Sequence, residues 1–401
     1  MRTASLVSIS ALLLAVSAFA SASRTTWAWI VASSNPPQRF GSAYVEGLSC
    51  ATASHCVTVG TYGGNSKPFA FSWDGRAYRS DVVPLPADAY TKGPGTHTSQ
   101  LKSVACPTQT ECLAVGSYEA RNTHPTGQIP VNRGLPLAEY WDGRTWATQP
   151  LAAPPQSSSG RNTSGLAAIS CPSARSCTSV GYYNVANDSV GELLAESWNG
   201  TTWSLEQIPD RAAARTAPEL TSVSCVGARF CMAVGWEGAG HGATRPFTAI
   251  RRGGQWKIAA APTPAGLGAN SQAQMLSVSC SAATACVAVG SYIHMSEYFP
   301  LAESWNGKRW TIRRVPAPTD PAGVLLFSVS CSTKSACSAV GGIGGKAPLA
   351  ERWNGQAWTT ETVARGHPGN GVLADVSCGF GRGCIAASGE QSRVLALFRR
   401  H

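Results

Sequence analysis

The chain is poor in charge, in long apolar runs and in helical periodicity. Charged residues make up 13% of its 401 positions, and beyond the N-terminal segment no apolar run approaches the roughly 20 residues of a membrane-spanning helix. No apolar stripe keeps the 3.6-residue period of a helix over a helical length. These absences argue against a membrane span and against a helical fold. The 41 glycines and 25 prolines instead indicate short strands joined by turns, so we expect an all-β fold.

Common catalytic motifs are also missing. There is no G-x-S-x-G nucleophile elbow, and no HxH or HExxH pair that would hold a metal ion. The glycine-rich run GGIGGKA (341–347) has the wrong length for a phosphate loop and lacks a Ser or Thr after Lys346. From the sequence we therefore assign no catalytic residue, no metal ligand and no cofactor.

The N-terminal residues have the features of an export signal. Arg2 precedes an apolar run from Leu6 to Val16, and small-x-small cleavage sites follow at residues 18–20 and 20–22. We expect residues 1–22 to be a signal peptide and residues 23–401 to be one secreted or cell-wall-associated domain. The formal net charge of +10 favours an anionic polymer as partner. The basic residues are scattered over many loops and not clustered with aromatic residues, which argues against nucleic acid.

All fourteen cysteines fall into pairs with five residues between the two members. The seven pairs are Cys50/Cys56, Cys106/Cys112, Cys171/Cys177, Cys225/Cys231, Cys280/Cys286, Cys331/Cys337 and Cys378/Cys384. Zinc sites are the alternative, but they favour two to four residues between ligands and often use histidine. In an exported chain this even count predicts seven local disulfides. Successive pairs start 47 to 65 residues apart, which is the length of one four-stranded propeller blade.

Each repeat divides into four expected strands, which we name A to D from the axis outward. The repeats begin near residues 47, 103, 168, 222, 277, 328 and 375. Asn-Gly or Asp-Gly marks a tight turn between C and D, and a Trp pair flanks most of these turns. Because the Trp pairs recur, we prefer packing between blades over a sugar-binding platform. The same reasoning makes the recurring glutamates Glu139, Glu196, Glu303 and Glu351 structural.

The two ends of the chain complement each other. The seventh repeat stops after its C strand (394–400), and residues 24–37 match the D strands of other repeats. We expect the N-terminal segment to complete the seventh blade, because closing the ring removes two unpaired strand edges.

The repeat resembles that of exported actinobacterial proteins built on SVSC-x5-C-x-AVG…LAESWNG-x-x-W, over nearly all of residues 23–401. It is distantly similar to the Asp-box repeats of sialidases and to the photosystem II assembly-factor propellers, whose turn S-x-D-x-G-x-x-W is one residue longer than SWNGKRW (304–310). The resemblance implies a propeller whose Asp-box-like turns are structural. The fourth repeat departs from it, because IRRGGQW (250–256) has Arg251 and Arg252 in place of Trp and Asn. We expect that blade to keep its hairpin without a Trp pair.

The loops divide into two faces. The A–B and C–D loops have nearly constant lengths and form what we call the cysteine-loop face, whereas the B–C and D–A loops vary and form the variable-loop face. We expect function on the variable-loop face. His97, His124, His241, His294 and His367 map to it, and solvent exposure is the preferred interpretation of these histidines. Aromatics ending the B strands either stack on a ligand or fill space between blades. The candidate ligand-binding residues are Tyr62, Tyr118, Tyr183, Trp236, Tyr292, His294, Glu297 and Glu237.

The leading hypothesis is an exported, monomeric, non-enzymatic binding module for a glycan, a cell-wall polymer or a protein. The alternative is a glycoside hydrolase or lyase that uses acids of the variable-loop face, where Glu119, Asp188, Glu192, Glu237 and Glu297 are available. A third reading is a protein-interaction scaffold without a small ligand.

Overall fold

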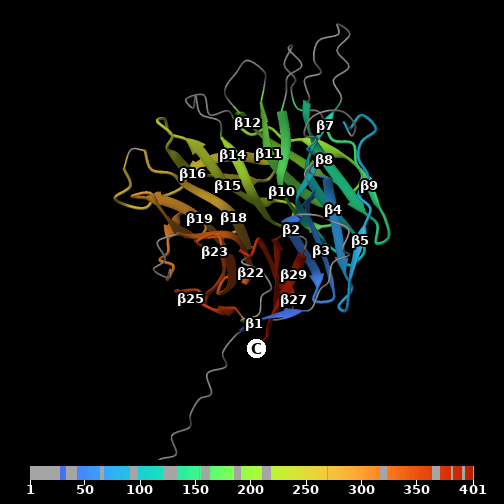
Figure 1. Cartoon of the computed structure of the whole chain (residues 1–401). Helices are drawn as coiled ribbons and strands as arrows, with labels where there is room; N and C mark the ends of the chain where they lie inside the picture. The colour runs from blue at the N-terminus through green and yellow to red at the C-terminus, as the bar shows by residue number, and fades with distance from the viewer. Residues whose placement is uncertain are drawn as a thin grey trace, which may run out of the picture.

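The structure is a closed ring of seven four-stranded blades (Figure 1). It is a computed structural model that describes residues 28–32, 43–63, 67–90, 98–120, 133–152, 154, 163–184, 191–209, 218–268, 270–316, 323–363, 371–380, 383–390 and 393–400. The predicted signal peptide lies outside these residues. Within the described part of the chain, no helix is long and apolar enough to span a membrane.

Each blade contributes one strand to each of four concentric layers, and neighbouring strands within a blade are antiparallel. The inner A strands are β2 (Ala43–Thr52), β6 (Gln100–Ala105), β10 (Thr163–Ser173), β14 (Glu219–Val226), β18 (Ala273–Ala282), β22 (Val324–Thr333) and β27 (Asp375–Phe380). The B strands are β3 (His55–Tyr62), β7 (Cys112–Ala120), β11 (Ser176–Asn184), β15 (Phe230–Gly238), β19 (Ala285–His294), β23 (Ala336–Ile343) and β28 (Gly383–Glu390). The C strands are β4 (Lys67–Trp73), β8 (Arg133–Trp141), β12 (Gly191–Trp198), β16 (Thr244–Arg252), β20 (Glu297–Trp305), β24 (Ala347–Trp353) and β29 (Arg393–Arg400). The outer D strands are β5 (Tyr78–Asp81), β9 (Trp146–Thr148), β13 (Trp203–Leu205), β17 (Gln255–Ala260), β21 (Trp310–Ile312), β25 (Trp358–Thr360) and β1 (Ala28–Ala32).

The ring closes as the sequence predicts. All five residues of β1 pair antiparallel with β29, so the N-terminal strand completes the blade that the C-terminal strand leaves open. A short strand from blade 6, β26 (Thr362–Val363), pairs with the other side of β1 in parallel. Trp29 lies opposite Arg399 in this blade, as Trp256 lies opposite Arg251 in blade 4. The closing blade therefore repeats the register of a blade that is continuous in the chain.

All seven predicted disulfides are present, and all fourteen cysteines are paired. Each disulfide joins a residue near the end of an A strand to one near the start of the B strand of the same blade. In the loop-entropy model a loop of this length contributes about 2 kcal/mol per disulfide. Seven disulfides indicate an oxidising environment. The bonds are Cys50–Cys56, Cys106–Cys112, Cys171–Cys177, Cys225–Cys231, Cys280–Cys286, Cys331–Cys337 and Cys378–Cys384.

The two cysteines of each pair differ in burial. The first is half-buried at the inner edge of the blade, whereas the second is at most 4% exposed and packs in an apolar cluster that links adjacent blades. Each disulfide therefore ties the inner strand of its blade to the hydrophobic core. The buried second cysteines are Cys56, Cys112, Cys177, Cys231, Cys286, Cys337 and Cys384.

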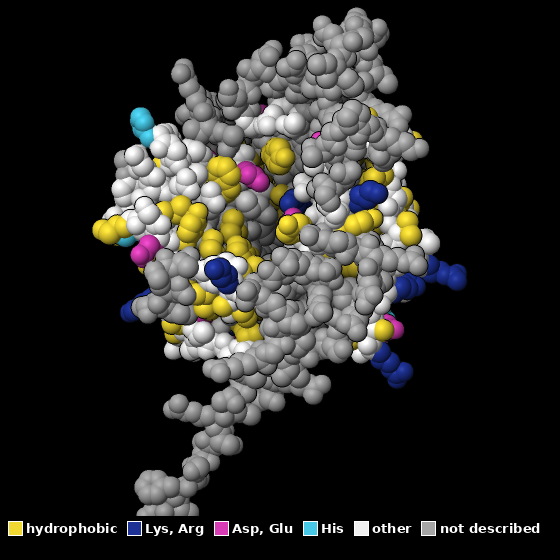
Figure 2. All heavy atoms as spheres, in the orientation of Figure 1, with side chains coloured by type: hydrophobic (Ala, Val, Ile, Leu, Met, Phe, Trp, Pro, Cys, Tyr) yellow, Lys and Arg dark blue, Asp and Glu magenta, His cyan; other side chains and the backbone are white. Residues whose placement is uncertain are grey.

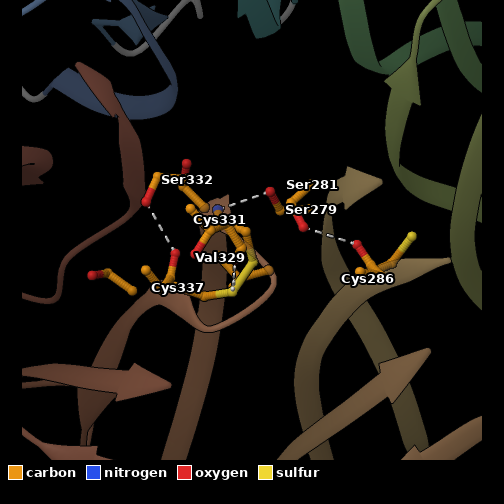
Figure 3. Close-up of a disulfide and its surroundings, with 12 residues drawn as sticks. Ser279, Ser281, Cys286, Val329, Cys331, Ser332 and Cys337 are labelled. Atoms are coloured by element: carbon orange, nitrogen blue, oxygen red, sulfur yellow. Dashed lines mark hydrogen bonds between the residues drawn. A yellow bond between two sulfur atoms is a disulfide. The ribbon is translucent and has the colours of Figure 1, made fainter. Parts of the chain in front are cut away.

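A ring of serine hydroxyls joins the A strands to one another around the axis. In six of the seven junctions, the backbone N–H of the first cysteine in one blade donates to the serine just before the first cysteine in the preceding blade. Figure 3 shows this bond for Cys331 N and Ser279 Oγ, which lie 2.9 Å apart. The other donor–acceptor pairs are Cys50 with Ser377, Cys106 with Ser49, Cys225 with Ser170, Cys280 with Ser224, and Cys378 with Ser330. The junction between blades 2 and 3 is the exception, because Ala105 stands at the serine position.

A second ring lies two residues earlier in the A strands. The acceptor serines are Ser103, Ser222, Ser277 and Ser328, and each receives a backbone N–H from the next blade. At the closing junction Asp375 takes this position, and its Oδ2 accepts from Leu48 N at 2.6 Å. Burial raises the pKa of Asp375 to about 6, against the lowering effect of hydrogen bonds from Ser328, Leu48 and Val376. The two rings explain why the motif SVSC recurs.

The predicted Trp pairs pack inside the molecule. Trp198 and Trp203 have ring centroids 5.6 Å apart across the C–D turn, and the pairs in blades 5 and 6 have the same spacing. These rings are less than a tenth exposed and lie in apolar clusters that link adjacent blades. The interpretation as packing residues is therefore confirmed.

The recurring glutamates are fully buried. Glu139, Glu196, Glu303 and Glu351 each have 0% of their surface exposed. Thr148 and Thr360 donate to Glu139 and Glu351 at 2.8 Å, whereas neither carboxylate oxygen of Glu303 has a hydrogen-bond partner among the described residues. Burial raises the pKa of Glu139 and Glu303 to about 8, and that of Glu196 and Glu351 to about 7. Burial therefore favours the neutral, protonated form of these four carboxyl groups.

Blade 4 keeps its hairpin by different means. Gly253 and Gly254 both have positive φ, as a tight two-residue turn requires. Arg251 replaces the usual Trp and makes two short bonds to Glu206 of blade 3, at 2.8 and 2.6 Å. Trp256 Nε1 donates to the same carboxylate at 2.6 Å. The expected loss of the Trp pair is confirmed, and a partly buried ion pair between blades stands in its place.

The serine ring predicts a stabilising substitution. Ala105→Ser should raise the free energy of unfolding by about 1 kcal/mol, because the new hydroxyl would accept from the N–H of Cys171. Ser279→Ala should lower it by about the same amount or more, because Cys331 N would lose its acceptor. Denaturant unfolding of both variants measures the two effects. A neutral or destabilising Ala105→Ser would contradict this account of the ring.

The buried glutamates predict that stability falls as pH rises. Their folded pKa values lie above the unfolded value near 4.5, so the folded state binds more protons between about pH 4.5 and 8 and its stability declines across that range. Glu303→Gln should flatten the decline and raise the melting temperature at pH 8.5 while changing it little at pH 5. The exposed Glu297→Gln serves as control. A melting temperature that rises with pH in the wild type and in Glu303→Gln alike would refute the assignment.

Candidate ligand-binding site in the central channel

All seven A strands line one cavity on the axis, which we call the central pocket. Its volume is about 360 Å³, and it lies beside the first half of the A strands, near the variable-loop face. Figure 2 shows the hollow at the centre of the ring, with basic and acidic side chains at its edge. Because every blade contributes, the pocket is formed only in the closed ring.

A β-bulge in the A strand aims one residue of each of blades 1 to 6 into this pocket. In blades 1 to 6 the pairing between strands A and B skips one residue, four positions before the first cysteine. Bulges redirect side chains in this way. The pocket-lining residues at this position are Glu46, Lys102, Ala167, Thr221, Leu276 and Phe327, with Ala374 in blade 7. The position differs among blades while the SVSC sequence beside it is repeated.

The bulge also explains the glycine of the repeated AVG. A Cβ on Gly290 would lie 2.0 Å from the carbonyl oxygen of Gln274 in the bulged strand, and the equivalent glycines of the other bulged blades meet the same obstacle. Only glycine allows this close approach. The glycine therefore maintains the bulge that points residues into the pocket.

The side of the pocket formed by blades 1 to 4 is polar and charged. Lys102 Nζ lies 2.9 Å from Glu46 Oε1, so an ion pair joins blades 1 and 2. Burial raises the pKa of Glu219, and Lys102 lowers it by a smaller amount. The pKa of Tyr182 is raised by burial and by the charge of Glu219. Perturbed groups of this kind in a cavity are typical of functional sites.

At the bulge position, blades 5 to 7 contribute apolar side chains, beside Ser277, Ser328 and Asp375 from the next position of each strand. Leu276, Phe327 and Ala374 occupy the positions that hold Glu46 and Lys102 on the other side. The carboxylate of Asp375 is engaged by the backbone and by Ser328. The pocket thus offers carboxylates, hydroxyl groups and the apolar side chains of Leu276 and Phe327 to one ligand.

The sequence-predicted ligand-binding residues lie outside this pocket. Tyr62, Tyr118, Tyr183 and Tyr292 belong to clusters between blades, and Tyr118 donates to Asp88 at 3.1 Å. Trp236 and Glu237 are half-buried in β15, opposite Pro246 and Arg245. His294 and the exposed Glu297 face each other at the tip of the β19–β20 hairpin. The structure does not gather these eight residues around one cavity, and their role in binding stays a prediction.

The disulfide cysteines, which the sequence also singled out, do not line the central pocket. Their bonds lie beyond the serine rings, toward the cysteine-loop face, whereas the pocket lies at the opposite end of the A strands. The second cysteines of blades 3 to 7 are surrounded by apolar side chains of the core, so their role is structural. These are Cys177, Cys231, Cys286, Cys337 and Cys384.

The histidines do not form a cluster among the described residues. His241 lies in the turn between β15 and β16, and His294 lies beside Phe299 at a ring distance of 6.5 Å. His97, His124 and His367 lie outside the described residues. Within the described ranges, no three His, Cys, Asp or Glu side chains are grouped as a metal site requires.

Comparison with known proteins shows the fold and no family. No protein-family model matches the chain, and no curated protein matches it. Among solved structures, YCF48 bound to D1 peptide aligns with a TM-score of 0.53 at 14% identity, over 92% of this chain and 96% of that one. The polysaccharide lyase ulvan lyase aligns with a TM-score of 0.54 at 10% identity, over 90% and 94%. The WD40 propeller of Doa1 aligns at 0.51 and 12%, over 93% and 97%. These neighbours are propellers and include interaction modules and an enzyme.

Proposed function

We propose that this propeller is an exported binding module that receives a positively charged group of a protein partner in its central pocket. The observation that carries the proposal is the bulge position. It holds a different residue in most blades, among them the paired Glu46 and Lys102, while Glu219 and Asp375 line the same cavity from other positions of their A strands. The predicted export signal and the seven disulfides support a location outside the cytoplasm.

The charges of the pocket favour a cation. Three carboxylates, those of Glu46, Glu219 and Asp375, line it together with one lysine. Lys102 is paired with Glu46, and burial makes ionisation of Glu219 costly in the free protein. A ligand ammonium beside Glu219 would offset that cost, because an opposite charge favours the ionised carboxylate.

The shape of the pocket favours a group on a short apolar stem. A lysine side chain or an amino-terminal residue places an ammonium next to methylene groups, which suit Leu276 and Phe327 in a pocket that also holds carboxylates. YCF48, which is similar in fold alone, is a propeller of comparable size that takes a peptide. A glycan or a cell-wall polymer remains the competing class of ligand.

The enzymatic alternative keeps one supporting observation. Glu219 and Tyr182 are neighbours with raised pKa values in a cavity, and a carboxylic acid with a raised pKa is suited to donate a proton to a leaving group. This arrangement would serve a glycoside hydrolase or a lyase. It does not identify a second carboxylate at the distance that a hydrolase requires.

Binding of short peptides tests the proposal. Peptides that carry lysine or a free amino terminus should bind the wild-type protein, and their acetylated counterparts should bind at least about tenfold more weakly. Glu219→Gln should weaken binding about tenfold, whereas the exposed Glu297→Gln should not change it. Affinity should fall as pH decreases, because protonation of Glu219 removes the charge that the ammonium meets. Isothermal titration calorimetry measures each effect.

Three results would contradict the proposal. The first is that acetylation leaves peptide affinity unchanged, and the second is that binding depends on Glu297 and not on Glu219. The third is binding of glycans alone, or release of sugar from wall polysaccharides that Glu219→Gln abolishes, which would favour the glycan-binding or the enzymatic reading.

A further inference from the structure

A second cavity lies between blades 1 and 2 on the cysteine-loop face. Its volume is about 210 Å³. The apolar part of its lining includes Val57, Trp73 and Trp141, and the polar part includes His55, Arg79 and Gln109. It lies beside the cysteine loops and C–D turns, whereas the central pocket lies at the other end of the A strands. It therefore does not depend on the proposed function.

One wall of the cavity is formed by Ser72, where the next blade has a larger residue; blades 3 and 5 also have serine at this position, Ser197 and Ser304. Ser72 lies opposite Val57 in blade 1, and Tyr140 occupies the equivalent place in blade 2, opposite Leu113. Tyr140 fills the junction between blades 2 and 3, where its ring lies 6.5 Å from that of Trp198 and its hydroxyl donates to Glu111 at 3.0 Å. Ser72 lines the cavity and leaves the corresponding space open.

The cysteine loop of blade 2 departs from the repeat at the same place. The A strands of blades 1, 3, 5 and 6 continue past their first cysteine into the loop, but β6 ends at Ala105, one residue before Cys106. In blades 3 and 5 the loop carbonyls of Ala174 and Ala283 accept from the indole Nε1 of the C-strand Trp, at 3.1 and 3.2 Å. These bonds fix the position of the ring.

Blade 2 lacks that bond. Gln109 is the equivalent loop residue and lines the cavity, while the Nε1 of Trp141 is buried without an acceptor among the described residues. The Trp141–Trp146 ring pair is also wider, at 6.4 Å against 5.6 Å in blades 3, 5 and 6. The blade 2 loop and its Trp pair are therefore arranged differently from those of blades 3 and 5 at the cavity wall.

We infer that this cavity binds one sugar residue. Its volume lies below the range of pockets for drug-sized molecules and suits one monosaccharide unit. The C–H face of a sugar ring packs against indole rings, and its hydroxyl oxygens accept hydrogen bonds from Gln109 and Arg79, which line the cavity. The C–D Trp pairs are packing residues in blades 3, 5 and 6, and the junction of blades 1 and 2 adds a binding role to this architecture.

Titration with glucose, galactose, N-acetylglucosamine and glucuronate tests the inference, with intrinsic tryptophan fluorescence and saturation-transfer NMR as readouts. At least one of these sugars should bind saturably in the millimolar range with one site per chain. Ser72→Tyr places in blade 1 the residue that fills the next junction, so it should weaken binding at least about tenfold without loss of cooperative unfolding. Gln109→Ala should also weaken binding, and it replaces Ser72→Tyr as the test if that variant does not fold. Glu219→Gln, in the central pocket, should leave sugar binding unchanged.

The inference is overturned if none of the four sugars gives a saturable signal with the folded wild-type protein. It is also overturned if sugar binds equally well to Ser72→Tyr and Gln109→Ala, or if Glu219→Gln removes it. The last result would place the sugar in the central pocket and would count against the peptide ligand proposed there.

Discussion

The inner edge of each A strand has no further strand of its blade to pair with, and the rest of the architecture depends on how this edge is satisfied. Buried backbone N–H groups need acceptors. Neighbouring A strands are not paired with one another in the described sheets, and β10 pairs with the preceding blade only at Thr163, opposite Gly134 of β8. Serine hydroxyls from the preceding blade supply the acceptors at two levels, as with Ser277 and Ser279 toward blade 6. Small residues at these positions therefore hold the blades together directly.

This constraint divides each A strand into fixed and free positions. Serine recurs at two positions because its hydroxyl accepts a hydrogen bond from the next blade. The bulge just before these positions needs a glycine on strand B. The bulge residue is skipped in the pairing with strand B, and its side chain differs among blades; in blade 4 the hydroxyl of Thr221 donates to Met275 O of the next blade at 2.8 Å. Glu46 and Lys102 can therefore meet in the channel, although 56 residues separate them in sequence. The bulge position, which the two serine rings do not use, brings these charged side chains into the pocket.

The sequence was sufficient for the repeat, the disulfides and the closure, because each is encoded by short spacings that recur. The position of the central pocket was not predictable in the same way. A bulge shifts the alternation of inward and outward residues by one, and nothing in a regular strand pattern marks it. In blade 3, Tyr183 fits the expected pattern at the end of strand B and packs between blades, while its neighbour Tyr182 lines the pocket. The feature of the sequence that marks the pocket is the residue four places before each first cysteine, because it differs among blades within an otherwise repeated segment.

The charge of the pocket opposes the charge of the chain, and the two act at different distances. A formal net charge of +10 attracts anionic molecules from afar, but salt screens that attraction beyond about 8 Å under physiological conditions. The carboxylates of Glu46 and Glu219 act only on a group that has already entered the pocket. The net positive charge of the protein does not repel a ligand with an acidic or neutral body, and the pocket carboxylates attract its one cationic tip. A uniformly basic ligand is repelled by the net positive charge before it reaches the carboxylates. The combination therefore selects for the distribution of charge along a ligand and not only for its net charge.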